Sequence, residues 1–236
     1  QGSTGSAVIP VYTNGSDVTI RYNTITAPVD GYGIGVQNHA DPTIENNVIY
    51  GANGGLRPVG IYVNDYSDPT ITGNTITAGN PTSDGGESIA VYVDWFSNPV
   101  IDGNILTAGQ ATGDRGKSVG IYSVNSSSPI ITNNTINAGY GKSVSYALYF
   151  SYGGWPVIDS NVMFTPESGS QSKYGMYIGS AARIDSMTRN NLYGFPDGFA
   201  LIYTEDRVLR TIEEVNDRWV PENSGYEEPD NYSEEP

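Results

Sequence analysis

The chain contains no cysteine, a single histidine and three methionines among its 236 residues. Without cysteine, disulfide bonds, thiolate metal sites and a cysteine nucleophile are excluded. Lysine and arginine total 11 against 26 aspartates and glutamates, which gives a formal net charge of −15 at pH 7. A surface with so few cations is unsuited to a phosphate backbone, so we expect no nucleic-acid partner. We also expect no cofactor and no metal site, because clustered His and Cys ligands are missing.

Long apolar runs and helical patterns are scarce as well. No apolar run is long enough to cross a bilayer, so we expect no membrane span. No segment before residue 204 has the apolar spacing of a helix. The chain begins at Gln1 and shows no signal peptide, so we interpret it as a processed or excised fragment.

One pattern recurs along most of the chain: an apolar residue, two residues of any type, Asn, one residue of any type, and a second apolar residue. Successive Asn residues lie 24, 27, 30, 30, 27 and 29 positions apart. A period of 20 to 50 residues indicates a stacked repeat architecture. The seven copies are Ile20/Asn23/Ile25, Ile44/Asn47/Ile49, Ile71/Asn74/Ile76, Ile101/Asn104/Leu106, Ile131/Asn134/Ile136, Ile158/Asn161/Met163 and Met187/Asn190/Leu192.

A second pattern, Gly-Ile-Tyr-Val at 60–63, runs in phase with the first. It recurs at 90–93, 120–123, 147–150 and 175–178, with weaker copies at 33–36 and 200–203. Its apolar residue precedes that of the Asn pattern by 10 positions in five consecutive repeats and by 11 in the last. Length variation therefore falls after the Asn pattern, which is typical of a solenoid with its insertions on one face.

Each pattern alternates apolar and other residues, and Val, Ile, Thr and Tyr are common in it, which predicts short strands. One repeat then holds three strands, each paired with its equivalent in the neighbouring repeats. The sequence predicts an all-β fold, a single-stranded parallel β-helix of about 7–8 rungs. We expect the Asn at the bend between the second and third strands, bonding from rung to rung through its side-chain amide.

Phrases such as Asn133-Asn134-Thr135-Ile136 make the chain resemble the right-handed parallel β-helices of the pectin-lyase-like superfamily. It is similar in style to NosD-like repeats and to the repeats of carbohydrate-binding and sugar-hydrolysing proteins. The resemblance covers roughly residues 8–203 and implies a right-handed coil. It does not imply one activity, because this fold hosts many functions. Composition and resemblance together favour an extracellular, periplasmic or cell-surface location.

The C-terminal part of the sequence differs from the repeats. We expect a β-helix over 1–204 and a short capping helix over 205–220, because residues 208, 209, 212 and 215 are apolar at helical spacing. Residues 221–236 carry six acidic and no basic residues, which predicts a mobile tail or linker. A Ca²⁺-binding tail is the alternative, although it has no ligand-loop spacing.

The tyrosine of the second pattern is the main candidate for function. If its apolar neighbours point into the coil, the tyrosine points outward. Such a column could stack as scaffold, bind sugar rings, or contact a protein. The resemblance implies that this outer face is the substrate groove. The column comprises Tyr62, Tyr92, Tyr122, Tyr149 and Tyr177.

The turns after these strands add candidates, namely Asp94, Trp95 and Trp155. Aromatic residues in exposed loops are costly unless they bind a ligand or pack locally. We therefore expect a monomeric, non-catalytic domain that binds polysaccharide or a surface protein along the Tyr column. A polysaccharide lyase or glycoside hydrolase with a nonstandard site near Asp94 is the first alternative, since Asp94 and Asp65 could pair as acid and base. A purely structural spacer is the second.

The related catalytic signatures are missing, which is why we leave the assignment as an enzyme open and lean against it. A polygalacturonase-like site has the sequence Asn-Thr-Asp. In this chain Asn-Thr is followed by Ile, at positions 25, 76 and 136. The only histidine, His39, lies in a turn without an obvious partner. Arg57, Glu87 and Lys117 occupy equivalent positions and predict a salt-bridge ladder.

Overall fold

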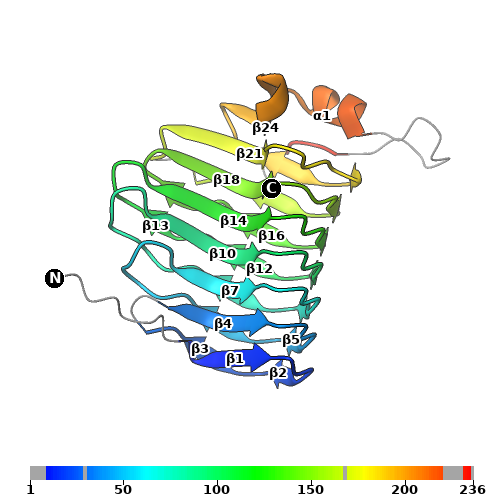
Figure 1. The fold of residues 1–236 in the computed structure, drawn as a ribbon. Coiled ribbons are helices and arrows are strands. Elements are labelled where there is room, and N and C mark those ends of the chain that lie inside the picture. Colours follow the sequence, from blue (N-terminus) through cyan, green and yellow to red (C-terminus); the bar gives the residue numbers. More distant parts are fainter. Residues whose placement is uncertain (1–8, 29–30, 167–168, 220–230, 235–236) are drawn as a thin grey trace.

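The computed structural model describes residues 9–28, 31–166, 169–219 and 231–234. The chain winds into a stack of similar coils, with the strands of successive coils lying side by side (Figure 1). Three long sheets run the length of the stack, and we call them sheets A, B and C in their order within one coil. Apart from one antiparallel strand at the end of sheet A, their strand pairs are parallel. The predicted all-β coil is confirmed.

Sheet A carries the Gly-Ile-Tyr-Val pattern. It consists of β1 (Val11–Asn14), β4 (Tyr32–Gln37), β7 (Val59–Val63), β10 (Glu87–Val93), β14 (Lys117–Val124), β18 (Val144–Ser151), β21 (Ser172–Ile178), β24 (Gly198–Ile202) and the antiparallel β25 (Arg207–Leu209).

Sheets B and C carry the two halves of the Asn pattern. Sheet B consists of β2 (Thr19–Arg21), β5 (Thr43–Glu45), β8 (Thr70–Thr72), β11 (Val100–Asp102), β15 (Ile130–Thr132), β19 (Val157–Asp159) and β22 (Ser186–Thr188). Sheet C consists of β3 (Thr24–Thr26), β6 (Val48–Tyr50), β9 (Thr75–Thr77), β12 (Ile105–Thr107), β16 (Thr135–Asn137), β20 (Val162–Phe164) and β23 (Asn191–Tyr193).

A short pair, β13 (Gln110–Ala111) and β17 (Tyr140–Gly141), lies in the long loops that lead from sheet C back to sheet A. These loops hold the length variation between repeats. The turn from sheet A to sheet B is of nearly constant length. The sequence-predicted location of insertions therefore corresponds to one side of the coil (Figure 1).

The core is a set of apolar columns in register. Ile71 of β8 pairs with Ile101 of β11, which pairs with Ile131 of β15, and all three side chains are fully buried. Equivalent columns run along sheets A and C. Since each core residue packs on its equivalents above and below, the repeat itself provides the packing partner.

The recurring Asn forms the predicted ladder at the bend between sheets B and C. Oδ1 of Asn104 accepts the backbone N–H of Asn74 at 2.8 Å and its side-chain amide at 3.0 Å. Nδ2 of Asn104 in turn donates to Ile71 O at 2.8 Å and to Oδ1 of Asn134 at 3.0 Å. These contacts satisfy the buried backbone N–H of Asn74, which lies outside the strands, so the ladder is scaffold.

The alternation of inward and outward side chains is broken at the same position in successive strands of sheet A, although their register stays one-to-one. Gly60 and Ile61 both point into the coil, since a Cβ on Gly60 would lie 2.4 Å from Cγ2 of the core residue Ile76. Simple alternation would place Val59 inside, but this side chain packs in a separate cluster with the tyrosines of the outer face. The small residue of the pattern is therefore required by the close approach of the backbone to the core.

The C-terminal end of the coil is covered. Helix α1 (Ile212–Trp219) follows η1 (Tyr203–Glu205) and β25, and it contacts β22, β24 and β25 at the end of the stack (Figure 1). Asn231 lies within the stretch that we expected to be a tail, yet it is buried and its Oδ1 accepts the backbone N–H of Asn190 at 2.9 Å. It thus adds one more step to the Asn ladder. The rest of the expected tail, 220–230 and 235–236, lies outside the described residues, and the division into three segments stays a prediction.

Candidate binding surface on sheet A

The five candidate tyrosines lie in one column on the outer face of sheet A. Neighbouring ring centroids are 5.1 Å apart for Tyr62 and Tyr92, 5.1 Å for Tyr92 and Tyr122, 4.3 Å for Tyr122 and Tyr149, and 4.4 Å for Tyr149 and Tyr177. The column arises because the strands pair in register, Tyr to Tyr. The structure therefore brings these five side chains together.

The column faces outward, and its side chains are half-buried. Beneath and beside the rings lies an outer apolar row that includes Val59, Ile89 and Val119, each fully buried, together with Tyr146. The break in alternation at Gly60 and its equivalents turns this row outward, and the tyrosine rings pack against it. Part of the column's role is thus to shield apolar surface, as the scaffold interpretation predicts.

Ring orientation limits what the column can bind. Tyr122, Tyr149 and Tyr177 are stacked with interplanar angles of 7° and 9°, so their faces cover one another. Solvent reaches this part of the column through ring edges and hydroxyl groups. A sugar ring therefore cannot stack on these faces, although its hydroxyls can bond with the phenol groups at the edge.

Burial raises the pKa of the Tyr62, Tyr92, Tyr122 and Tyr149 phenols above the ordinary value of about 10. The carboxylate of Asp94 raises the pKa of Tyr62 and Tyr92 further, because it repels a phenolate. The column is consequently a row of neutral hydroxyls at neutral pH. Neutral phenols can both donate and accept hydrogen bonds.

The predicted salt-bridge ladder is present and lies beside the column. Glu87 is bonded to Arg57 at 2.6 Å and to Lys117 at 2.9 Å, and its side chain is only 13% exposed. The two cations also lie over tyrosine rings, with Arg57 Cζ 5.5 Å from the Tyr92 centroid and Lys117 Nζ 5.1 Å from that of Tyr149. The ladder thus packs against the tyrosine rings on the side of sheet A where its strands begin.

Asp94 lies at the opposite end of the strand, where β10 enters its turn. Its Oδ1 accepts the Trp95 backbone N–H at 2.8 Å and the Asn125 side-chain amide at 2.7 Å, and the Tyr92 hydroxyl lies 3.4 Å from Oδ2. The residue is 7% exposed. These contacts hold the turn in place, where Trp95 and the next residue, Phe96, have positive φ angles of 46° and 57°.

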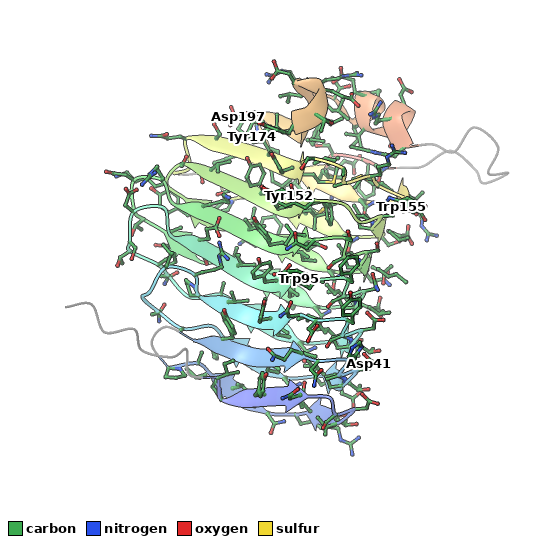
Figure 2. All side chains as sticks on the ribbon, in the orientation of Figure 1. Asp41, Trp95, Tyr152, Trp155, Tyr174 and Asp197 are labelled. Carbon is green, nitrogen blue, oxygen red and sulfur yellow. The ribbon has the colours of Figure 1, made fainter. Side chains whose placement is uncertain are left out.

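Three aromatic side chains extend from the turns after the tyrosine strands. Trp95, Tyr152 and Trp155 are 53%, 64% and 63% exposed. Trp95 and Tyr152 occupy equivalent turn positions two coils apart, and the smaller Asn125 lies between them. In Figure 2, Trp95 and Tyr152 lie near the carboxyl ends of the front strands, and Trp155 lies farther out at the corner toward sheet B. We call Trp95, Tyr152 and Trp155 the aromatic rim.

Other turn aromatics pack against each other instead. Tyr66 stacks on His39 at 5.3 Å and on Phe96 at 5.2 Å between ring centroids. This stack supplies the partner for His39 that the sequence did not suggest. The rim residues differ, because no ring contact involves Trp95, Tyr152 or Trp155 among the described residues.

Several residues of this surface escaped sequence reasoning. Tyr32, Tyr146 and Tyr174 lie in the outer row three positions before the column, and Tyr203 contacts Tyr177 at the C-terminal end of the column. Asn125 shapes the gap in the aromatic rim. Only the offset of three residues between Tyr146 and Tyr149 was visible in the sequence as a signal, since it repeats at Tyr174 and Tyr177.

In the described part of the chain, no group of three or more His, Asp or Glu side chains is arranged to hold a metal ion. None of the helices described is long and apolar enough to cross a membrane.

The coil, its three parallel sheets and its Asn ladder define a right-handed parallel β-helix. A family model described as a right-handed beta helix region matches residues 7–199, so the chain belongs to that family. This agrees with the resemblance to the pectin-lyase-like superfamily. Comparisons with curated proteins and with solved structures gave no significant match.

Proposed function

We propose that this β-helix binds polysaccharide along the turn side of sheet A, without cleaving it. The observation that carries the proposal is the aromatic rim, in which large aromatic faces remain exposed while neighbouring aromatics of the same turns are stacked. Exposed aromatic side chains that gather on one face, rather than singly, are typical of a ligand-binding surface.

A polysaccharide fits the arrangement because both the ligand and the surface are repetitive. Equivalent groups recur at each rung, at the strand spacing of about 4.8 Å. Trp95 and Tyr152 offer flat apolar faces to the C–H side of sugar rings, and the neutral phenols of the Tyr column offer donors and acceptors to sugar hydroxyls. We therefore propose that sugar rings stack on the rim, whereas the Tyr column contributes hydrogen bonds.

The contacts of Asp94 support a binding role over a catalytic one. A general acid or base needs an oxygen within reach of the substrate. Asp94 is buried, and donors from Trp95, Asn125 and Tyr92 occupy its carboxylate. We therefore assign Asp94 the role of a positioning residue for the rim. The assignment to an extracellular, periplasmic or cell-surface location stays part of the proposal.

The test is binding of the purified protein to a panel of polysaccharides. We expect Trp95→Ala and Tyr152→Ala each to weaken retention about tenfold, since a well-packed aromatic anchor contributes ~1–2 kcal/mol. Tyr22→Ala is the matched control, because Tyr22 is 74% exposed but lies between β2 and β3. It should bind as the wild type does.

Two outcomes would contradict the proposal. If the wild-type protein binds no polysaccharide, the rim serves another partner, such as a surface protein, or the coil is a spacer. If wild-type protein releases reducing or unsaturated sugars, and Asp94→Asn abolishes the release while the fold is intact, the protein is an enzyme.

A further inference from the structure

A hollow lies on another side of the coil, where sheet C meets the long loops that return to sheet A. Its volume is about 310 Å³. It spans three consecutive coils and is lined by Tyr50, Gly51, Asn53, Thr77, Ala78, Asn80, Thr107, Ala108, Gly109 and Gln110. None of these belongs to the Tyr column or the aromatic rim. We call it the sheet C groove.

Two polar columns form the walls of the sheet C groove. Thr77 and Thr107 are register partners on the outer face of β9 and β12. Opposite them, Asn53 accepts the backbone N–H of Asn80 through Oδ1 at 3.0 Å. Asn80 accepts the backbone N–H of Gln110 in the same way at 2.7 Å. Because each Oδ1 must face a backbone donor, each Nδ2 is left pointing away from the loop.

These walls hold polar groups that the described residues do not engage. The Nδ2 groups of Asn53 and Asn80, the Gln110 side-chain amide and both threonine hydroxyls have no hydrogen-bond partner within that part of the chain. Five such groups converge over three coils. Converging groups of this kind are satisfied by water or by a ligand that carries several hydroxyls.

The floor and the ends complete the site. Small residues form the floor because the loop backbones touch there, and a Cβ on Gly109 would lie 2.4 Å from Gly79 O. Tyr50, which is 43% exposed, stands at one end in line with Thr77. One aromatic side chain thus borders the polar walls.

The charge of the groove indicates its ligand. The ten lining residues include no acidic or basic side chain, although the chain as a whole carries a net charge of −15. From these features we propose that the sheet C groove is a second binding site, which takes an uncharged, hydroxyl-rich chain such as a neutral oligosaccharide. Amide donors and hydroxyls bind its oxygens, and Tyr50 packs on the apolar face of one sugar ring. This site is independent of the proposed rim.

The experiment uses hexasaccharides of glucose, mannose, xylose and galactose, with a hexagalacturonate as the charged comparison. Binding is measured by calorimetry on the wild type and on the Thr77→Val/Thr107→Val double variant. Thr75→Val is the matched control, because Thr75 lies on β9 outside the groove and its register partners are Val48 and Ile105. Valine retains the shape and strand preference of threonine while removing the hydroxyl.

We expect at least one neutral hexasaccharide to bind, and the double variant to weaken it tenfold or more, as the loss of two hydrogen bonds requires. Thr75→Val should change the affinity less than twofold. The side-chain amide NMR signals of Asn53, Asn80 and Gln110 should shift on binding. The proposal is overturned if no neutral hexasaccharide binds, if the double variant binds equally well, or if hexagalacturonate binds as tightly.

Discussion

At the scale of single residues, the interior asparagines are the most extensively hydrogen-bonded side chains of the repeat in the described part of the chain. Oδ1 of Asn104 accepts two hydrogen bonds, and its Nδ2 lies within bonding distance of three oxygens. The residue is 1% exposed. Removing the side chain would leave the buried backbone N–H of Asn74 without its partner and would interrupt the ladder between Asn74 and Asn134.

We therefore predict that Asn104→Ala lowers the free energy of unfolding by about 2–5 kcal/mol, because unsatisfied buried polar groups are costly. Asn23→Ala is the control, because Asn23 lies at the exposed first step of the same ladder. It should cost under ~1 kcal/mol. Urea denaturation measures both, and equal losses would show that the ladder is not stabilised by burial.

The tyrosines give a prediction at alkaline pH. The pKa of the buried column phenols is higher in the folded protein than in the unfolded chain, so their contribution to stability is complete below about pH 10 and is lost as the pH rises further. We expect the ultraviolet titration of tyrosine to show a late group of phenols that ionises together with unfolding. A single titration near pH 10, with the circular dichroism unchanged, would contradict a half-buried column.

At the scale of the element, the sequence predicts only part of the side-chain orientation in the strands of sheet A. Alternation correctly placed Tyr62 outside and Ile61 inside. It could not reveal the break in alternation at Gly60, because that break depends on the packing of the strand against Ile76 of another sheet. The outer row of Val59, Ile89 and Val119 follows from that break and was therefore missed.

The candidate site was predictable to a similar degree. In-register repeats place Tyr92 on Tyr122 whatever the loops do, so the column could be read from spacing. The stacking angles, the engagement of Asp94 by Asn125, and the sheet C groove depend on side-chain contacts between coils. Spacing alone does not contain those contacts. Asn231 escaped notice because it lies 41 residues after Asn190, outside the period of the repeat.

The ion ladder of sheet A gives a prediction at acidic pH. Burial alone would raise the pKa of Glu87, but Lys117 and Arg57 outweigh it, and the pKa is lowered. The stabilisation is thus present above the ordinary glutamate pKa and is lost as the pH falls through the lowered value. We expect Glu87→Gln to lower the melting temperature at pH 7 and to reduce its fall between pH 7 and 3. An identical pH profile in the variant would contradict this role.

At the scale of the whole molecule, the two ends of the coil differ. Helix α1, β25 and Asn231 cover the C-terminal end. At the other end, β1, β2 and β3 pair on one side only among the described strands. A stack of this kind is held by contacts between neighbouring repeats, so opening can begin at an end and spread.

We predict that hydrogen exchange is fastest in β2 and β3 and slowest in the central strands β11 and β12, with β22 protected by its cover. Asn231→Ala should raise exchange in β22 and β23 while leaving β11 and β12 unchanged, because the effect of a lost contact is local in a solenoid. Exchange mass spectrometry resolves these segments. Uniform exchange along the coil would instead indicate that the molecule opens as one unit.

The Asn ladder has a mechanical consequence as well. Its hydrogen bonds, like those between the strands, run parallel to the axis of the coil, from one repeat to the next. Tension applied along that axis loads every bond at one interface simultaneously, whereas force drawing the chain out from one end breaks the bonds of successive interfaces in turn. The coil is therefore expected to resist stretching between its two ends far better than peeling from one of them.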